Sequence, residues 1–286
     1  MNSEPWGKPQ THTLSDNRLH LQHGPIDLII KADGDRTQVA DGYQAAISRF
    51  QNVLTELVGE LDLLRRPLIE KRPPLRMPIA KRMAVACWPH RANIITPMAS
   101  VAGAVADDIL DVMLQTSPEL HTAFVNNGGD IACHVSVGRG LRIGVVKDLH
   151  KAVPEGVIPI NHSCGIATSG WRGRSFSLGI ADAVTVIAKN AAEADAAATM
   201  VANAVNIDAA TIARQPAQTL DPDSDLGGLL VTTGVGSLSA TQIETALQSG
   251  VKIAESLLDK NLIAGALLSL NGTWRAVQKT HAKMLS

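Results

Sequence analysis

The chain has 286 residues, and its 26 Lys and Arg residues nearly balance its 27 Asp and Glu residues. This length is sufficient for a large core in one domain or in two closely joined ones. The balanced charge and an aromatic content of only 3% disfavour nucleic acid as a partner. Such a chain offers neither a strong cationic field nor a set of base-stacking platforms.

The cysteines and the N-terminal residues indicate the compartment. Cys87, Cys133 and Cys164 are an odd number without C-x-x-C spacing, which argues against a disulfide framework and a thiolate zinc site. Residues 1–17 are polar and lack the apolar centre of a signal peptide. No apolar run approaches the roughly 18 residues that cross a bilayer. We expect a soluble, cytoplasmic protein that does not associate with membranes.

The first third of the sequence predicts strands followed by a long helix. Residues 18–22 and 26–32 are short extended segments, and the turn residues Asp33-Gly34-Asp35 follow the second. Apolar residues recur at three- and four-residue spacing over 39–64, which predicts an amphipathic helix that covers one face of a sheet. Four prolines and several cations in 65–78 predict a surface connection.

The rest of the informative sequence mixes helices and strands. Small residues over 96–114 predict a helix that lets another backbone approach closely. Alternating residues in 131–137 and 141–145, around Gly138-Arg139-Gly140, predict a β-hairpin. A strand is expected at 184–188 and an Ala-rich helix at 191–206, capped by Asn190 and Glu193. Because no βαβ rhythm appears, we predict an α+β fold in a single domain.

Three familiar motifs are rejected. The glycines at 138, 140 and 144 are out of register for a dinucleotide fingerprint, and a strand follows them. The acidic run 221–225 has Leu226 and Thr232 where a calcium loop needs Gly and Glu. The nine histidines include no pair with zinc spacing.

Three other stretches are candidates for ligand binding. Gly128 and Gly129 could turn their N–H groups toward an anion, although a tight turn would use the same residues. The small, uncharged stretch 165–170 could lie flat against a planar ligand or could simply close a strand. Asp195 and Thr199 share one face of a helix, where their oxygens suit magnesium bound to phosphate. Favourable interaction with the helix dipole is the alternative explanation for Asp195.

Together these stretches resemble one family, the ApbE superfamily of FAD:protein FMN transferases. The resemblance covers residues 120–206, through the segments 127–131, 165–170, 184–188 and 194–199. Residues 165–169, 172–175 and 179–184 are most similar to the UPF0280 branch of that superfamily.

The resemblance implies an ApbE-like (T-fold-like) architecture of mixed sheets with packed helices. It also implies that magnesium, held by Asp195 and Thr199, promotes cleavage of the FAD pyrophosphate and transfer of FMN to a Thr or Ser of an acceptor protein. The implied flavin site, for FAD or FMN, consists of Asn127, Gly128, Gly129, Asp130, Ala167, Thr168, Ser169 and Gly170.

One departure from the family leaves the reaction open. The transferases carry a His-x-x-Asp-Pro-x-Thr-Gly segment, whereas residues 171–183 here contain no His and no Pro. Asp182 is the candidate replacement for the base or for a ligand. Two functions therefore remain: a magnesium-dependent FAD pyrophosphatase or FMN transferase, and a non-catalytic flavin- or nucleotide-binding accessory protein of sulfur or cofactor metabolism. The acceptor protein and a homo-oligomeric state are not specified by the sequence.

Overall fold

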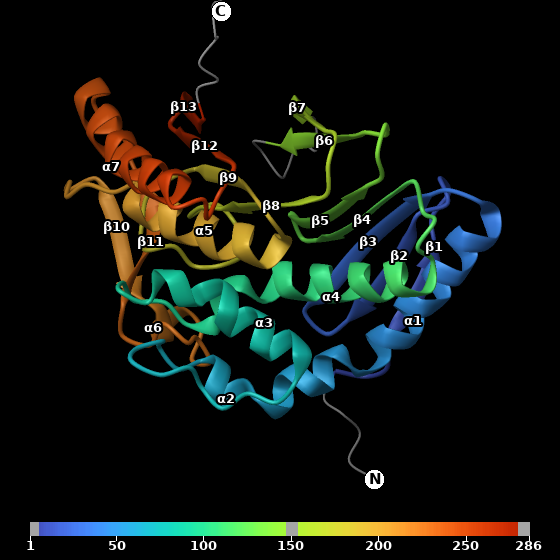
Figure 1. The fold of residues 1–286 in the computed structure, drawn as a ribbon. Helices are drawn as coiled ribbons and strands as arrows, with labels where there is room; N and C mark the ends of the chain where they lie inside the picture. Colours follow the sequence, from blue (N-terminus) through green and yellow to red (C-terminus); the bar gives the residue numbers. More distant parts are fainter. Residues whose placement is uncertain (1–5, 147–153, 280–286) are drawn as a thin grey trace, which may run out of the picture. The chain divides into compact units, whose positions relative to one another are not determined.

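The structure is a computed structural model that describes residues 6–146 and 154–279 (Figure 1). The chain divides into two compact units. Unit 1 contains the residues up to Ala167 together with Asn190–Ala196, and unit 2 contains Thr168–Lys189 and the residues from Ala197 onward. Strand β8 and helix α5 each begin in unit 1 and end in unit 2. Within the described ranges, no helix is both long and apolar enough to cross a membrane.

Unit 1 is an antiparallel sheet with helices packed against it, in the strand order β1-β2-β3-β4-β5-β8. Its elements are β1 (Gln10–Thr13), β2 (Leu19–His23), β3 (Ile26–Asp33), α1 (Arg36–Gly59), α2 (Leu61–Leu64), α3 (Pro78–Cys87), η1 (Trp88–His90), η2 (Pro97–Ser100), α4 (Val101–Thr116), β4 (Thr122–Asn127), β5 (Asp130–Val135), β6 (Leu141–Val146), β7 (Pro154–Ile160) and the start of β8 (Cys164–Ser169). The predicted α+β class is confirmed by this arrangement.

The long helix predicted at 39–64 is confirmed, with one break. Asp35 caps α1 by accepting a hydrogen bond from Thr37 N at 2.8 Å. The helix packs against α4, β2 and β3, as Figure 1 shows. It ends at Glu60, whose carboxylate accepts hydrogen bonds from Arg76 N and Met77 N at 2.6 and 2.9 Å. Glu60 thus holds the end of the Pro-rich connection, which contains no helix or strand between α2 and α3.

The hairpin predicted around Gly138–Gly140 is wrong. Strand β5 pairs with β4 and β8, whereas β6 pairs with β7 in a separate two-stranded sheet. The tight hairpin turn lies ten residues earlier, at Gly128 and Gly129 between β4 and β5. The alternation of apolar residues was correct for both strands, but alternation does not identify the partner of a strand.

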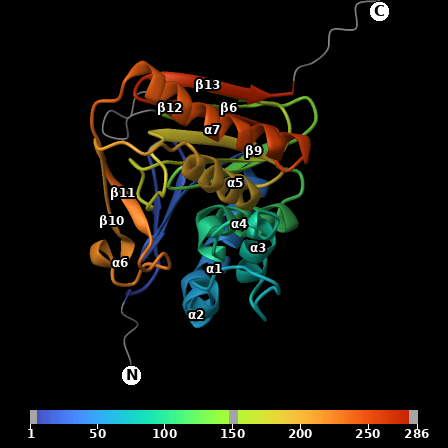
Figure 2. The same cartoon turned by 90° about the vertical axis from the view of Figure 1, so that its left-hand side faces the viewer.

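Unit 2 combines two antiparallel arrangements with a long helix. Strands β9, β12 and β13 lie side by side in that order, and β10 pairs with β11. Helix α7 packs against β12 and β13 (Figure 2). The elements are β9 (Ala183–Ala188), α5 (Ala191–Ala204, in its second half), β10 (Ile212–Pro216), α6 (Ala217–Leu220), β11 (Leu230–Val235), α7 (Ala240–Asp259), β12 (Gly265–Leu270) and β13 (Thr273–Gln278). The predictions of a strand at 184–188 and a helix at 191–206 are confirmed.

Candidate functional site

Gly128 and Gly129 form the two-residue turn that joins β4 to β5. The register places Asn127 opposite Asp130, directly before and after the turn. The φ angles of the two glycines are 66° and 116°, in a region that residues with side chains rarely adopt. Gly129 N donates a hydrogen bond to Asn126 Oδ1 at 2.8 Å. Turn geometry therefore accounts for both glycines.

The same end of the sheet brings other candidate residues to this turn. In the β5–β8 register Ile131 lies opposite Ile166, so the next residues, Asp130 and Ala167, come to the same end of the pair. Asn127 lies on the neighbouring strand, and its Nδ2 donates to Ala102 O at the start of α4, at 3.1 Å. The turn is thereby attached to the N-terminal end of a helix.

Helices α4 and α5 each place a carboxylate at the N-terminal end of the other helix. Both carboxylate oxygens of Asp107 in α4 accept hydrogen bonds, from Ala191 N and Ala192 N, each at 2.9 Å. Asp195 in α5 returns the contact by accepting from Gly103 N at 3.1 Å. A negative charge at a helix N-terminus is favourable because unsatisfied N–H groups and the positive end of the dipole lie there.

Two glycines make room for the first turn of α5. A Cβ at Gly103 would lie 2.2 Å from Ala191 O, and a Cβ at Gly165 would lie 1.9 Å from the carbonyl carbon of Asn190. Both distances are far inside van der Waals contact. Close packing of the α5 backbone therefore explains Gly165 in the flat stretch, without reference to a ligand.

Asp195 is held in an electrostatically unfavourable place for a lone carboxylate. Desolvation raises its pKa well above the ordinary value, and the neighbouring Asp130 raises it further, while the N–H of Gly103 lowers it. Part of the residue surface remains exposed to solvent. Two acidic side chains thus come together beside the glycine turn, where a cation would relieve their repulsion.

Asp107 is the second perturbed acid of the site. It is 5% exposed, and burial raises its pKa to about 6, although the N–H groups of Ala192 and Ala191 oppose the shift. Arg82 Nη1 lies 3.6 Å from Asp107 Oδ2, and the same guanidinium pairs with Asp111. Sequence reasoning missed Asp107, Gly103 and Arg82, because their partners are distant in the chain.

The donor set favours a hard cation with few protein ligands. Over residues 6–146 and 154–279, no group of three or more His, Cys, Asp or Glu side chains could hold a metal ion. The groups gathered around Asp195 are a second carboxylate and main-chain atoms. Magnesium fits such a site, because it prefers oxygen ligands and usually keeps several waters and phosphate oxygens in its coordination shell.

The remaining candidates belong to unit 2. Thr168 is exposed, and its Oγ1 lies 2.9 Å from Thr185 Oγ1 on β9. Ser169 is half-buried, and a Cβ at Gly170 would lie 2.6 Å from Asp182 O. Packing against the Asp182 backbone is therefore a sufficient reason for Gly170.

Asp182 accepts a hydrogen bond on each of its carboxylate oxygens. One carboxylate oxygen accepts from Arg172 Nε at 2.7 Å, and the other accepts from Asn271 N at 2.5 Å. The Arg172 guanidinium also lies over the Trp171 ring, 4.6 Å from its centroid. These contacts describe a structural anchor for the loop after Gly170.

The half-buried Thr199 follows four residues after Asp195 on α5 and belongs to unit 2.

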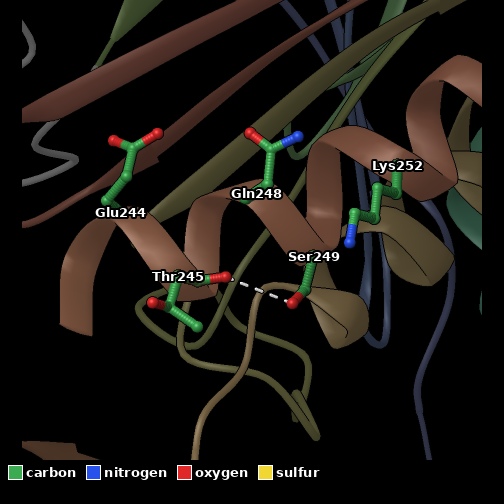
Figure 3. A pocket seen from close by; sticks show the side chains of 5 residues that line it. All are labelled: Glu244, Thr245, Gln248, Ser249 and Lys252. Atoms are coloured by element: carbon green, nitrogen blue, oxygen red, sulfur yellow. Dashed lines mark hydrogen bonds between the residues drawn. The ribbon is translucent and has the colours of Figure 1, made fainter. Parts of the chain in front are cut away.

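Unit 2 also carries a pocket on α7. Figure 3 shows its lining side chains, which project from successive turns of one helix: Glu244, Thr245, Gln248, Ser249 and Lys252. Ser249 Oγ donates to Thr245 O at 3.2 Å, a bond within the helix itself. None of the predicted site residues lines this pocket, so we do not assign the site there.

The predicted site residues thus fall into two sets. Unit 1 brings together Asn127, Gly128, Gly129, Asp130, Ala167 and Asp195, at one end of its sheet. Unit 2 holds Thr168, Ser169, Gly170, Asp182 and Thr199. The first set defines an α+β protein with an acidic site beside a glycine hairpin and two helix N-termini.

Comparison with known proteins identifies the family. The family model described as "AbpE bacteria" matches residues 11–276, and the chain belongs to this family. A UPF0280 protein of Methanothrix thermoacetophila is 30% identical over 215 residues, which cover 73% of this chain and 85% of that protein. A UPF0280 protein of Archaeoglobus fulgidus is 40% identical over 106 residues, covering 37% of this chain and 42% of that protein.

A solved structure supports the same fold. The ApbE protein of Thermotoga maritima MSB8 aligns with a TM-score of 0.51 over 95% of this chain and 96% of that chain. The two sequences are 13% identical, so the likeness concerns the fold alone. The predicted ApbE-like architecture is confirmed, as is the resemblance to the UPF0280 branch.

Proposed function

We propose that this chain is an ApbE-like flavin-binding protein that cleaves the pyrophosphate of FAD in the presence of magnesium and can pass FMN to an acceptor. The proposed flavin contacts are the turn residues Asn127–Asp130 and the stretch Ala167–Gly170. The proposed magnesium ligands are Asp195 and Thr199. A cytoplasmic location, a single ApbE-like domain and a separate acceptor protein remain predictions from the sequence.

The enclosed carboxylate of Asp195 carries this proposal. A helix does not require an Asp there, and burial next to Asp130 makes the ionised form costly. Retaining an acid at such a place favours a task beyond folding. A cation would relieve the repulsion between the two acids, which agrees with the ligand role that the family resemblance implies.

The chemistry assigned to the protein's own groups is positioning. Bound magnesium would supply Lewis acidity to the phosphoryl oxygens and neutralise the charge that develops as AMP departs. Asp130 and Asp195 would orient the cation, and the backbone of the glycine turn would lie beside the phosphates. Asp107 would fix the first turn of α5 and so fix the direction of Asp195.

The decisive experiment compares wild type with Asp195→Asn. The Asn side chain can still accept the hydrogen bond from Gly103 N, and it removes the repulsion from Asp130, so the fold should be retained. FAD affinity measured with magnesium should fall by at least about tenfold, because a hard cation loses a charged ligand. Affinity measured without magnesium should be unchanged. AMP release from FAD, followed by chromatography, should fall in parallel.

Asp259→Asn is the matched control, because Asp259 is an exposed acid at the end of α7. It should leave both the affinity and the AMP release at wild-type values. Equal magnesium-dependent affinities of wild type and Asp195→Asn would refute the metal role. Thr199→Val tests the second proposed ligand in the same way.

A non-catalytic flavin- or nucleotide-binding role is the second candidate. It is favoured by the engagement of Asp182 with Arg172 and Asn271, because these contacts give a structural role to the candidate replacement for the missing histidine in the segment 171–183. Magnesium-dependent FAD binding without any AMP release or change in protein mass would establish this second function over the first.

A further inference from the structure

Two of the three cysteines meet across neighbouring strands of unit 1. Cys133 in β5 lies directly opposite Cys164, the first residue of β8, in the antiparallel register. The side chains interact, since a hydrogen bond links the two thiols. Both are free thiols, as is the distant Cys87. The sequence gives no sign of this pair, because 31 positions separate its members.

The strand geometry is compatible with a covalent bond between them. Directly opposed residues of an antiparallel pair have Cα atoms about 4.5 or 5.5 Å apart, depending on the hydrogen-bonding position. Disulfides join Cα atoms separated by about 4.4 to 6.8 Å. The register therefore places the two residues within bonding range at either kind of position, without movement of the backbone.

The pair faces away from the helices that build the acidic site. Gly165 directs its missing side chain toward the backbone of Asn190 and Ala191, so alternation along β8 directs Cys164 to the opposite face of the sheet. Cys133 and Cys164 are 3% and 4% exposed, and residues 161–163, which precede Cys164, are exposed. Fraying of this strand end would admit a small reagent to Cys164 first.

We propose that Cys133 and Cys164 are a redox-modification site that forms a reversible disulfide between β5 and β8 by exchange with a low-molecular-weight disulfide.

The exchange proceeds in two balanced steps. The Cys164 thiolate attacks one sulfur of the small disulfide, forms a mixed disulfide and releases the other half as a thiolate that takes up a proton. The Cys133 sulfur then attacks Cys164, its proton leaves, and the second small thiol departs. The two protein thiols are thereby oxidised by two electrons, and one small disulfide is reduced to two thiols.

The order of attack follows from the hydrogen bond between the thiols. The Cys133 thiol lowers the pKa of Cys164, whereas the same hydrogen bond, together with burial, raises the pKa of Cys133. The thiolate is the nucleophile in exchange, so Cys164 should attack first and Cys133 should resolve the intermediate.

The test is oxidation of the full-length protein with oxidised glutathione, followed by alkylation in denaturant and intact mass measurement. Reduced wild type should take up three alkyl groups, and oxidised wild type only one. The matched variant Cys87→Ala should take up none after oxidation, because its two remaining cysteines are the proposed pair. A digest should contain one linked peptide that joins residues 133 and 164. Dithiothreitol should restore the reduced pattern.

Single variants test which of the two cysteines attacks first. Cys133→Ala should accumulate one glutathione on Cys164, since no resolving thiol remains, but more slowly than wild type reacts, because the thiol that lowers the pKa of Cys164 is gone. Cys164→Ala should stay largely unmodified. Closing this loop should raise the midpoint of thermal unfolding of the wild type by several degrees, a rise that both single variants lack. Three alkyl groups on oxidised wild type, or a linked peptide that includes Cys87, would overturn the proposal. A failure of FAD binding would not affect it, because the test involves no flavin.

Discussion

The two units bury different kinds of polar group. Unit 1 buries the carboxylates of Asp107 and Asp108, which are 5% and 8% exposed. In the described part of unit 2 the buried polar side chains are hydroxyls only: Ser177, Thr185, Thr232 and Ser269. A buried hydroxyl needs one good partner, such as Gly179 O for Thr232 at 2.8 Å. A buried carboxylate costs far more and needs several partners.

This difference shows that the cost of burying carboxylates falls on unit 1. In unit 1 the N–H groups of Ala191 and Ala192 satisfy Asp107, and Arg49 satisfies Asp108. In unit 2 helices and strands approach closely with no buried acid, as at Gly179, where a Cβ would lie 2.1 Å from Ala202 O. We infer that the acidic end of unit 1 serves a site, and that this packing of unit 2 serves the fold.

Both units contain glycines that let two backbone segments approach closely. Substitution of these glycines should have the largest effect on the free energy of unfolding. Gly165→Ala in unit 1 and Gly179→Ala in unit 2 each place a methyl group about 2 Å from backbone atoms. Each change should lower the free energy of unfolding by about 3 kcal/mol, because a backbone neighbour cannot rotate aside. Chemical denaturation of each variant provides the measurement.

Gly228→Ala is the control for both substitutions. No atom lies within 4 Å of its added Cβ, so its stability should remain within about 0.5 kcal/mol of wild type. If Gly165→Ala were as stable as Gly228→Ala, the packing explanation of the flat stretch would fail. Contact with a planar ligand would then be the better explanation for Gly165.

The buried acid of unit 1 should produce a pH dependence that unit 2 lacks. The folded pKa of Asp107 is raised to about 6 from an ordinary value of 3.8, so the folded protein binds the proton more tightly than the unfolded chain. Its contribution to stability is therefore fully present below the unfolded pKa and is lost as the pH rises through the folded pKa. A shift of this size corresponds to about 2–3 kcal/mol.

Denaturation of wild type and Asp107→Asn at several pH values measures this effect. The difference in unfolding free energy between the two proteins should favour wild type more strongly near pH 4 than near pH 7, by about 2–3 kcal/mol. A difference that grows in the opposite direction would mean that the N–H groups of Ala191 and Ala192 outweigh burial. The raised pKa of Asp107 would then be disproved.

Local signals in the sequence were sufficient for several elements. The apolar spacing over 39–64 found α1 and α2, and Asn190 with Glu193 found the start of α5, where Glu193 N donates to Asn190 Oδ1 at 2.8 Å. A similar signal marks α7, which begins with a capping box formed by Ser239 and Gln242, and a scan for that pattern could have found it. These features depend on neighbours in the chain, so the sequence alone displays them.

Contacts between distant residues could not be predicted in this way. The alternation over 131–145 found two strands but assigned them to each other, because periodicity carries no information about the partner. The candidate residues Asn127–Asp130 and Asp195, taken from the family pattern, lie at one end of unit 1, and their ligand-binding role stays a prediction. Asp107 was missed, since its role depends on two N–H groups more than 80 positions away. Ion pairs and carboxylate caps between helices that are distant in the chain leave no local pattern in the sequence.

The smallest expected effect concerns the ion pair between Asp182 and Arg172 in unit 2. Asp182 is paired with Arg172, whose side chain is 59% exposed, and solvent weakens such a pair. A double-mutant cycle of Asp182→Asn and Arg172→Ala should give a coupling of about 0.5–1 kcal/mol. Arg174→Ala, at an exposed neighbour, is the control and should show no coupling with Asp182→Asn.

The same variants decide whether Asp182 is an anchor or a base. An anchor predicts that Asp182→Asn and Arg172→Ala have similarly small effects on AMP release from FAD, since neither side chain touches the reacting atoms. A base predicts a loss of about a hundredfold or more for Asp182→Asn, because general base catalysis contributes at least that much, while Arg172→Ala retains the carboxylate. We expect the anchor result, because both carboxylate oxygens accept hydrogen bonds, from Arg172 and Asn271, that hold the side chain in place. A hundredfold loss confined to Asp182→Asn would move the catalytic centre toward unit 2 and reverse the contrast between the units.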